Sequence, residues 1–216
     1  MSERPAIEAC NSAGAIAEIA AAAIGEALVR AVQARGEAAF IATGGSSPGE
    51  TYDRLSQADL PWDKVSVALS DERRVPVSHP MSNEGQLRAR LLVGKAAPAR
   101  YIPLEEAAIA SAEPFDVALL GMGADGHFAS LFPGSPVLTR GLDPDGGKHV
   151  IEVPVGEPAP DLPRLSLTLP VIASCPLILV LTQGEAKRRI LETGSGLPIH
   201  RLIAAAKGRV RLIWRP

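Results

Sequence analysis

Short apolar segments alternate with helix-forming segments along the whole chain, and this alternation limits the fold more than any other feature. Five apolar runs have the length of buried strands: Ala38–Ala42, Val65–Leu69, Val117–Leu120, Leu177–Leu181 and Val210–Trp214. The longest helical pattern spans residues 11–35 and ends near Gly36. Strands that alternate with helices predict an α/β fold with a mainly parallel, doubly wound (Rossmann-like) sheet and helices on both faces.

Weaker patterns place the remaining elements. Further helices are predicted at about 48–56, at about 82–93, after Gly184 and at about 198–206. Residues 149–153 are predicted to form a strand near a sheet edge, and residues 164–169 alternate polar and apolar side chains. The Pro- and Gly-rich segment 133–147 is predicted to be a loop and not a domain linker. A chain of 216 residues has the size of one domain, so we expect a single domain over residues 1–216.

Composition narrows the classes of partner. The net charge of −2 gives no reason to expect nucleic acid. Cys10 and Cys175 are too few for a disulfide framework and lack metal-ligand spacing. No basic leader precedes the acidic N-terminal residues, and no apolar run approaches a membrane span. We therefore expect a cytoplasmic protein, a monomer or a small homo-oligomer, with a small molecule as partner and neither nucleic acid nor membrane.

The stretch from Phe115 to Pro136 carries the clearest candidate chemistry. Its apolar run breaks into Gly121, Gly123 and Gly126, which allow a sharp turn and a close approach to a ligand. Asp125 and His127 stand inside that turn, and a histidine can move a proton near neutral pH. Considered alone, the pair is equally consistent with a solvated surface loop.

Two other strand ends also carry polar groups, at Gly44-Gly45-Ser46 and at Asp71-Glu72-Arg73. The carboxyl ends of parallel strands lie on one edge of a sheet, so all three turns are expected to face one crevice. A Gly-Gly-Ser turn that enters a helix is suited to a phosphate, although a plain turn with a capping serine has the same pattern. Lys187 is expected in the first turn of a helix, where a bound anion would compensate its charge. A solvated basic face and, for Arg73, an internal ion pair remain the alternatives.

Two motif matches carry less weight. Gly121-x-Gly123-x-x-Gly126 matches the dinucleotide fingerprint, but the prolines and glycines that follow exclude the crossover helix that this motif requires. Residues 45–49 match the nucleophile-elbow pattern, but only one strand is expected upstream, so this stays a minor alternative.

Taken together, the motifs resemble the 6-phosphogluconolactonase family, within the group that includes glucosamine-6-phosphate isomerase/deaminase. The resemblance rests on five segments in the family order: residues 44–48, Asp71–Pro76 with Ser82-Asn83, residues 121–133, Arg164–Pro170 and Gly184-x-x-Lys187. The deaminase motif continues into Ala-Phe-Asn-Glu-Pro and has tyrosine after its carboxylate pair. Here residues 129–133 contain no glutamate and Arg73 follows Glu72, so the resemblance favours the lactonase.

The resemblance implies hydrolysis of 6-phosphoglucono-δ-lactone to 6-phosphogluconate without a metal or an organic cofactor. His127 is then expected to be the general base, with Asp125 orienting it or the water, and Arg73 to stabilise the oxyanion or hold the sugar acid. The phosphate is expected to bind Gly44, Gly45, Ser46 and Lys187, with Arg164 or Arg201. An aminosugar-phosphate deaminase and a non-catalytic sugar-phosphate-binding protein remain the competing interpretations.

Overall fold

A seven-stranded parallel sheet forms the centre of the molecule. The computed structural model describes residues 5–156 and 162–216, and the sheet order in it is β1-β10-β9-β6-β2-β3-β5. Its strands are β1 (Ile7–Ala9), β2 (Ala38–Ala42), β3 (Val65–Leu69), β5 (Arg100–Ile102), β6 (Val117–Gly121), β9 (Leu177–Gln183) and β10 (Val210–Arg215). The inner strands are almost entirely buried because helices cover both faces.

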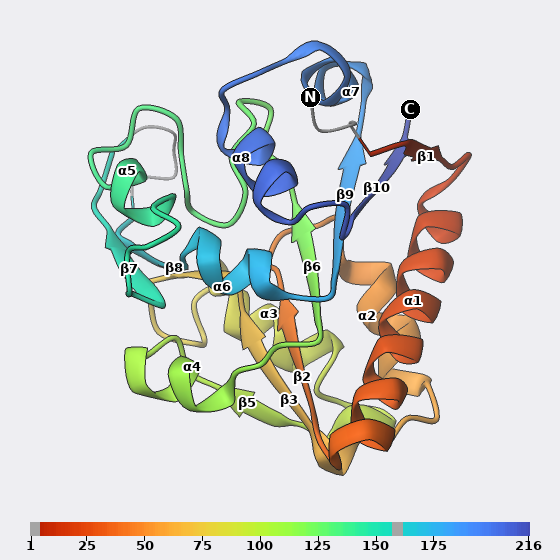
Figure 1. The fold of residues 1–216 in the computed structure, drawn as a ribbon. Helices are drawn as coiled ribbons and strands as arrows, with labels where there is room; N and C mark the ends of the chain where they lie inside the picture. Colours follow the sequence, from red (N-terminus) through yellow and green to blue (C-terminus); the bar gives the residue numbers. More distant parts are fainter. Residues whose placement is uncertain (1–4, 157–161) are drawn as a thin grey trace.

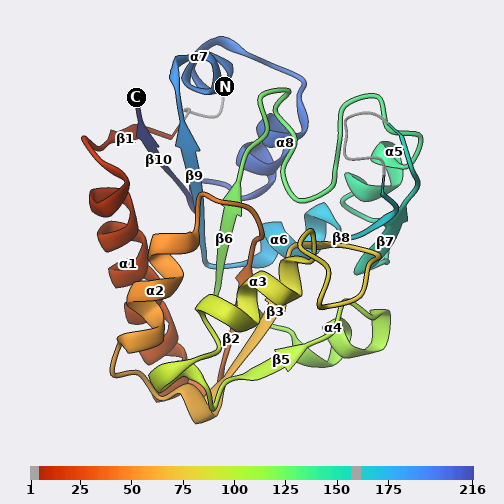
Figure 2. The ribbon, with the colours of Figure 1, turned by 180° about the vertical axis from the view of Figure 1, so that it is seen from behind.

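The helices lie on both sides of this sheet, as Figures 1 and 2 show from opposite directions. They are α1 (Ala13–Arg35), α2 (Gly49–Gln57), α3 (Asn83–Arg90), α4 (Glu106–Ala112), α5 (Leu138–Gly141), α6 (Leu169–Ser174), α7 (Glu185–Thr193) and α8 (Pro198–Ala205), with 3₁₀ turns at Trp62–Lys64 and Gly94–Ala96. α6 and α8 lie in front of the sheet in Figure 1, whereas α2 and α3 lie in front in Figure 2. The predicted doubly wound α/β fold is therefore confirmed.

α1 shows how the sequence produces this packing. Ser12 caps its first turn through a hydrogen bond from the Ala15 N–H, and Gly36 ends it with a φ of +86°. Ala20, Ile24 and Leu28 share the buried face because they are four residues apart. The small alanines let the helix lie close to the sheet.

The direction of the chain through the sheet reverses between β2 and β6. From β2 the chain continues outward through β3 and β5, and then returns to the other side of β2 to form β6, β9 and β10. The loops that follow β2 and β6 therefore separate at the carboxyl edge of the sheet. In open α/β sheets this is the position where ligands bind.

A second, three-stranded antiparallel sheet lies beside the main one. Its order is β4 (Asp71–Arg73), β8 (Arg164–Leu167) and β7 (Val150–Val153). The strand predicted at 149–153 is therefore present and forms an edge, but of this small sheet and not of the main one. Its alternating burial matches a strand with one covered face, which periodicity alone could not assign to a particular sheet.

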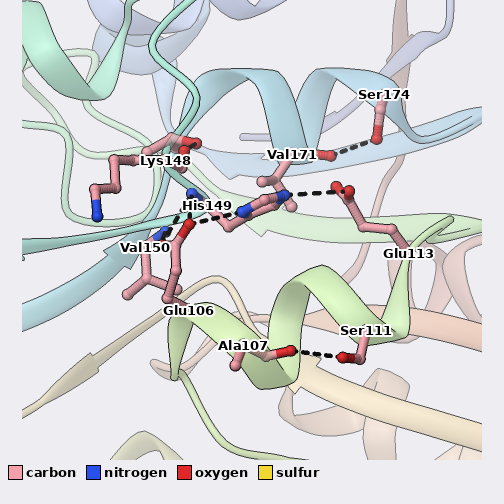
Figure 3. Close-up of polar contacts among 10 residues, drawn as sticks. Glu106, Ala107, Ser111, Glu113, Lys148, His149, Val150, Val171 and Ser174 are labelled. Atoms are coloured by element: carbon pink, nitrogen blue, oxygen red, sulfur yellow. Dashed lines mark hydrogen bonds and ion pairs between the residues drawn. The ribbon is translucent and has the colours of Figure 1, made fainter.

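A histidine clasp joins the small sheet to the main body (Figure 3). His149, just before β7, lies between Glu106 at the start of α4 and Glu113 after its end. Its Nδ1 is 2.8 Å from Glu106 Oε1, and its Nε2 is 3.4 Å from Glu113 Oε2. The Glu106 carboxylate also accepts hydrogen bonds from the backbone N–H groups of His149 and Val150. The clasp therefore fixes where β7 begins.

Opposing effects set the protonation of the clasp. Partial burial raises the pKa of Glu106, but the hydrogen bonds from His149 and Val150 outweigh it and bring this pKa to about 2. The hydrogen bond to Glu106 raises the pKa of His149, burial opposes it, and the charge of Glu113 adds to the rise. The imidazolium form is the one that this cluster stabilises.

Short elements were absent from the sequence predictions. β1, β5, α4 and α6 contain three to seven residues each, too few for a periodic pattern. The segment 133–147, predicted as a loop, contains the four-residue helix α5. Within residues 5–156 and 162–216 no helix combines the length and the apolar character needed to cross a membrane. The single domain predicted over residues 1–216 includes residues 1–4 and 157–161, which lie outside the described part of the chain.

Candidate active site

A cavity of about 190 Å³ opens at the chain reversal between β2 and β6. The loops after β2, β3 and β6 all reach it, as the sequence predicted. Its walls are formed by Thr43, Gly44, Gly45, Asp71, Arg73, Asn83, Gly121, Met122, Gly123, His127, Ala129 and Arg164. Residues more than 100 positions apart in the sequence therefore meet around one hollow.

Asp125 and His127 form a hydrogen-bonded pair in the loop after β6. His127 Nδ1 is 2.6 Å from Asp125 Oδ1, and the backbone N–H of His127 donates to the same oxygen at 3.2 Å. A carboxylate beside Nδ1 selects the tautomer that carries its proton there, which leaves Nε2 as a proton acceptor. Among the described residues Nε2 makes no hydrogen bond.

Gly123 makes room for this pair. A Cβ at position 123 would lie 2.1 Å from His127 Nδ1 and 2.5 Å from Asp125 Oδ1. The imidazole also contacts the ring of Phe132, with the centroids 4.4 Å apart in an edge-on arrangement. Both contacts restrict the orientation of the His127 ring, whose side chain is 25% exposed.

Arg73 and Arg164 occupy opposite positions on neighbouring strands. They form a direct pair in the antiparallel β4–β8 ladder, and both line the cavity. Like charges directly opposite each other destabilise a sheet. Burial lowers the pKa of Arg164, the charge of Asp71 raises it, and the charge of Arg73 lowers it again. Two cations held this way create a site for an anion.

The guanidinium groups have different surroundings. Arg73 Nη1 donates to the carbonyl oxygen of Met81 at 3.1 Å and to the side-chain oxygen of Asn83. Its Nε is buried and has no hydrogen-bond partner within the described chain. Arg164 lies over the ring of Phe132, 5.0 Å from its centroid. Arg73 Nη2 makes no hydrogen bond to the described residues, so Arg73 retains donor capacity for an oxygen atom of a ligand.

The two acidic residues before Arg73 have separate roles. Asp71 is buried, and its carboxylate accepts hydrogen bonds from Ser70 Oγ at 3.0 Å and Ser130 Oγ at 2.6 Å, which joins the β3 and β6 loops. Glu72 instead accepts the backbone N–H groups of Asn83 and Glu84 at the start of α3. No group of three His, Cys, Asp or Glu side chains in the described chain is arranged to bind a metal ion.

The residues of the Gly44-Gly45-Ser46 turn line two different cavities. Gly44 and Gly45 line the central cavity, and Gly45 has a φ of +89°. Ser46 lines a neighbouring hollow of about 320 Å³. The hydroxyl of Tyr52 closes the base of the turn, because it accepts the Thr43 N–H at 2.8 Å and donates to the Thr43 carbonyl at 2.6 Å.

The last two predicted residues lie outside the cavity wall. Lys187 is half-buried in the first turn of α7, as predicted. Burial lowers the pKa of its ammonium group, and the charge of Asp125 raises it. Arg201 lies exposed on α8 and is not among the residues that line the central cavity. Of the two arginines that sequence left open for phosphate, only Arg164 faces the cavity.

Sequence reasoning assigned no role to several cavity residues. Asn83 was noted only as part of a motif, and Asp71 only as a member of a carboxylate pair. Ala129 has a φ of +48°. This left-handed conformation is uncommon for alanine, so the sequence did not predict it. No local signal identifies Asn83, because Ser82 is the N-cap of α3 and the Asn83 side chain instead bonds Asp71 and Arg73.

Comparisons with known proteins show which family the chain belongs to. The family described as glucosamine-6-phosphate isomerases/6-phosphogluconolactonase matches residues 11–214. The chain is 44% identical to a 6-phosphogluconolactonase of Caulobacter vibrioides, over 96% of each protein. It is 37% identical to the 6-phosphogluconolactonase of Mesorhizobium japonicum, over 89% of this chain and 88% of the relative. A crystal structure of a 6-phosphogluconolactonase from Shewanella baltica matches over the whole of both chains with a TM-score of 0.89 at 29% identity. The chain therefore belongs to the glucosamine-6-phosphate isomerase/6-phosphogluconolactonase family.

Proposed function

We propose that this protein hydrolyses 6-phosphoglucono-δ-lactone to 6-phosphogluconate, the second step of the oxidative pentose phosphate pathway. The relatives with the name 6-phosphogluconolactonase cover nearly the whole chain. One structural observation carries the proposal: a carboxylate-bound imidazole and a pair of arginines line the same cavity. That combination supplies a proton acceptor and an anion site for one substrate.

His127 acts as the general base. Its Nε2 takes a proton from a water molecule while the water oxygen forms a bond to the lactone carbonyl carbon. The tetrahedral intermediate then collapses, the ring C–O bond breaks, and the departing oxygen takes the proton from the imidazolium. Asp125 holds the ring through Nδ1 and stabilises the positive charge that forms on it. No electron transfer occurs, so the step requires no redox cofactor.

Arg73 stabilises the negative charge that develops on the carbonyl oxygen. A fixed cation in a partly dry site is effective because it needs no reorganisation during the reaction. Its place in the cavity wall and its contacts with Met81 and Asn83, which hold Nη1, support this role. Arg164, directly opposite, adds to the positive potential and binds an anionic group of the substrate.

The phosphate binds beside the Gly44–Ser46 turn. A cavity of about 190 Å³ is smaller than the roughly 300–1,000 Å³ typical of ligand sites, so part of the substrate extends beyond it. Ser46 and Lys187 lie outside the central wall, and they are the groups suited to a phosphate that projects outward. The protein is proposed to be cytoplasmic, a monomer or a small homo-oligomer, and to act without nucleic acid, metal or cofactor.

The decisive test is acid release from freshly generated 6-phosphogluconolactone, measured above the uncatalysed rate. A rate that increases in proportion to enzyme concentration supports the proposal. Ammonia release from glucosamine 6-phosphate would favour the deaminase instead. Binding of 6-phosphogluconate without turnover of the lactone would favour the non-catalytic alternative.

A further inference from the structure

Asn83 lies where three parts of the cavity wall meet. It is the first residue of α3, its side chain is 2% exposed, and it lines the cavity together with Gly44 and Arg73. An asparagine buried to this extent must have its amide hydrogen-bonded, because an unpaired amide in the interior is costly. Its partners therefore show what it holds in place.

Both ends of the Asn83 amide are used. Its Oδ1 accepts a hydrogen bond from Arg73 Nη1, and its Nδ2 donates to the carbonyl oxygen of Asp71 at 2.8 Å. The backbone N–H of Asn83 donates to Glu72 Oε1, also at 2.8 Å. These contacts connect α3 to three consecutive residues of β4, so the amide cannot rotate without breaking a bond.

The Asn83 amide also lies against the Gly44–Ser46 turn. A Cβ on Gly44 would stand 1.9 Å from Asn83 Oδ1, so the asparagine occupies the space that any side chain at position 44 would need. The glycine and the asparagine are therefore matched in shape. This contact adds a second restraint on the Asn83 side chain, from the opposite wall.

We propose that Asn83 is a positioning residue for the hydrolysis proposed above, and that it acts through Arg73. The guanidinium is planar and rigid, so a bond that fixes Nη1 also fixes where Nε and Nη2 point. Asn83 Oδ1 and the Met81 carbonyl together hold Nη1 and leave Nη2 for the substrate. Without Asn83, Arg73 keeps its charge but loses its fixed orientation.

The first test does not depend on activity. The Arg73 Nε–H resonance in ¹H–¹⁵N spectra is assigned by its absence in Arg73→Lys, and its exchange with water is measured. The proposal predicts exchange at least about tenfold faster in Asn83→Ala than in the unaltered protein, and near-normal exchange in Gln86→Ala, a matched change on the same helix. An unchanged rate in a folded Asn83→Ala protein would overturn the proposal.

The second test is a double-mutant cycle on kcat/KM with Arg73→Ala, Asn83→Ala and the double variant. Asn83→Ala is expected to lower kcat/KM by about 10- to 100-fold, mostly through kcat, as for a displaced catalytic group. In the Arg73→Ala background the same change should cost less than about twofold, because its target is gone. Equal losses in both backgrounds would show that Asn83 acts independently of Arg73.

A replacement variant and a separate readout cover the cases in which Asn83→Ala does not fold or the protein lacks lactonase activity. If Asn83→Ala does not fold, Asn83→Ser takes its place, since a serine keeps a polar side chain at this position but is too short to reach Arg73. A protein without lactonase activity but with the predicted change in Nε–H exchange would contradict the proposed function and leave the Asn83–Arg73 link supported. The two failures are therefore distinguishable.

Discussion

Arg73 and Arg164 stand directly opposite each other on the antiparallel strands β4 and β8, and both side chains reach the same cavity. Like charges directly opposite each other destabilise a sheet, and here the charge of the buried Asp71 carboxylate offsets part of this repulsion. A bound anion reverses this repulsion. The arrangement therefore places positive potential where the proposed substrate develops an oxyanion.

Because Arg73 and Arg164 both line the cavity, an anionic ligand is expected to raise the Tm of the protein. 6-Phosphogluconate at about 100 times its Kd should stabilise the folded protein by about 2.7 kcal/mol, seen as a rise in Tm. Arg164→Met should lose most of this shift at the same ligand concentration, whereas Arg201→Met should keep it because Arg201 lies away from the cavity. If Arg201→Met lost the Tm shift and Arg164→Met kept it, the anion site would lie at α8 instead.

Gly123 should be intolerant of even one added carbon. The Cβ of Gly123→Ala would overlap the Asp125–His127 pair, so kcat should fall by about 10²-fold or more while the fold is retained. Gly121→Ala is the matched control for folding, since its Cβ would meet nothing within 4 Å. Full activity in Gly123→Ala would mean that the observed pair is not the catalytic arrangement.

Lys187 is expected to favour the phosphorylated lactone over the unphosphorylated one. Lys187→Ala is expected to weaken turnover of 6-phosphogluconolactone much more than turnover of unphosphorylated glucono-δ-lactone, compared by kcat/KM. Lys187→Arg need not be silent, because a planar guanidinium binds phosphate differently from a compact ammonium. Equal losses on both lactones would argue against contact between Lys187 and the phosphate.

The histidine clasp predicts a pH-dependent stability. The pKa of His149 is raised in the folded state, so its contribution is complete below its unfolded value of about 6.5 and is lost as the pH rises through the folded value. The pKa of Glu106 is lowered to about 2, so its contribution is present above its unfolded value of about 4.3 and is lost as the pH falls toward 2. The clasp is therefore strongest between about pH 4.5 and 6.5.

His149→Gln isolates this effect. The Tm difference between the unaltered protein and His149→Gln should be largest near pH 5.5 and should shrink as the pH increases above about 7. Thermal unfolding followed by circular dichroism from pH 5 to 9 measures it. A difference that stays constant over this range would show that His149 contributes through packing and not through its charge.

The sequence predicted the main fold because its strands and helices carry strong local patterns. β2, β3, β6, β9 and β10 are mostly apolar, and the carboxyl ends of parallel strands lie on one edge of a sheet, so their loops were expected to meet there. His127, Arg73, Arg164, Gly44 and Gly45 do line one cavity. Their roles in the reaction stay predictions.

The features that the sequence did not predict depend on contacts between segments far apart in the chain. Nothing local to residues 149–153 or 164–167 shows that they pair with each other and with residues 71–73 in a separate sheet. For the same reason the direct opposition of Arg73 and Arg164 could not be read from residues more than 90 positions apart. The role of Asn83 depends on an orientation that only tertiary structure sets.

The central claim is that His127 supplies the base, and the most direct measurement is kcat of His127→Ala on freshly generated 6-phosphogluconolactone, with the uncatalysed rate subtracted. The structure leads us to expect a decrease of about 10²- to 10⁴-fold, the usual effect of losing a positioned general base, with the Tm nearly unchanged. A folded His127→Ala protein with near-normal turnover would contradict the account.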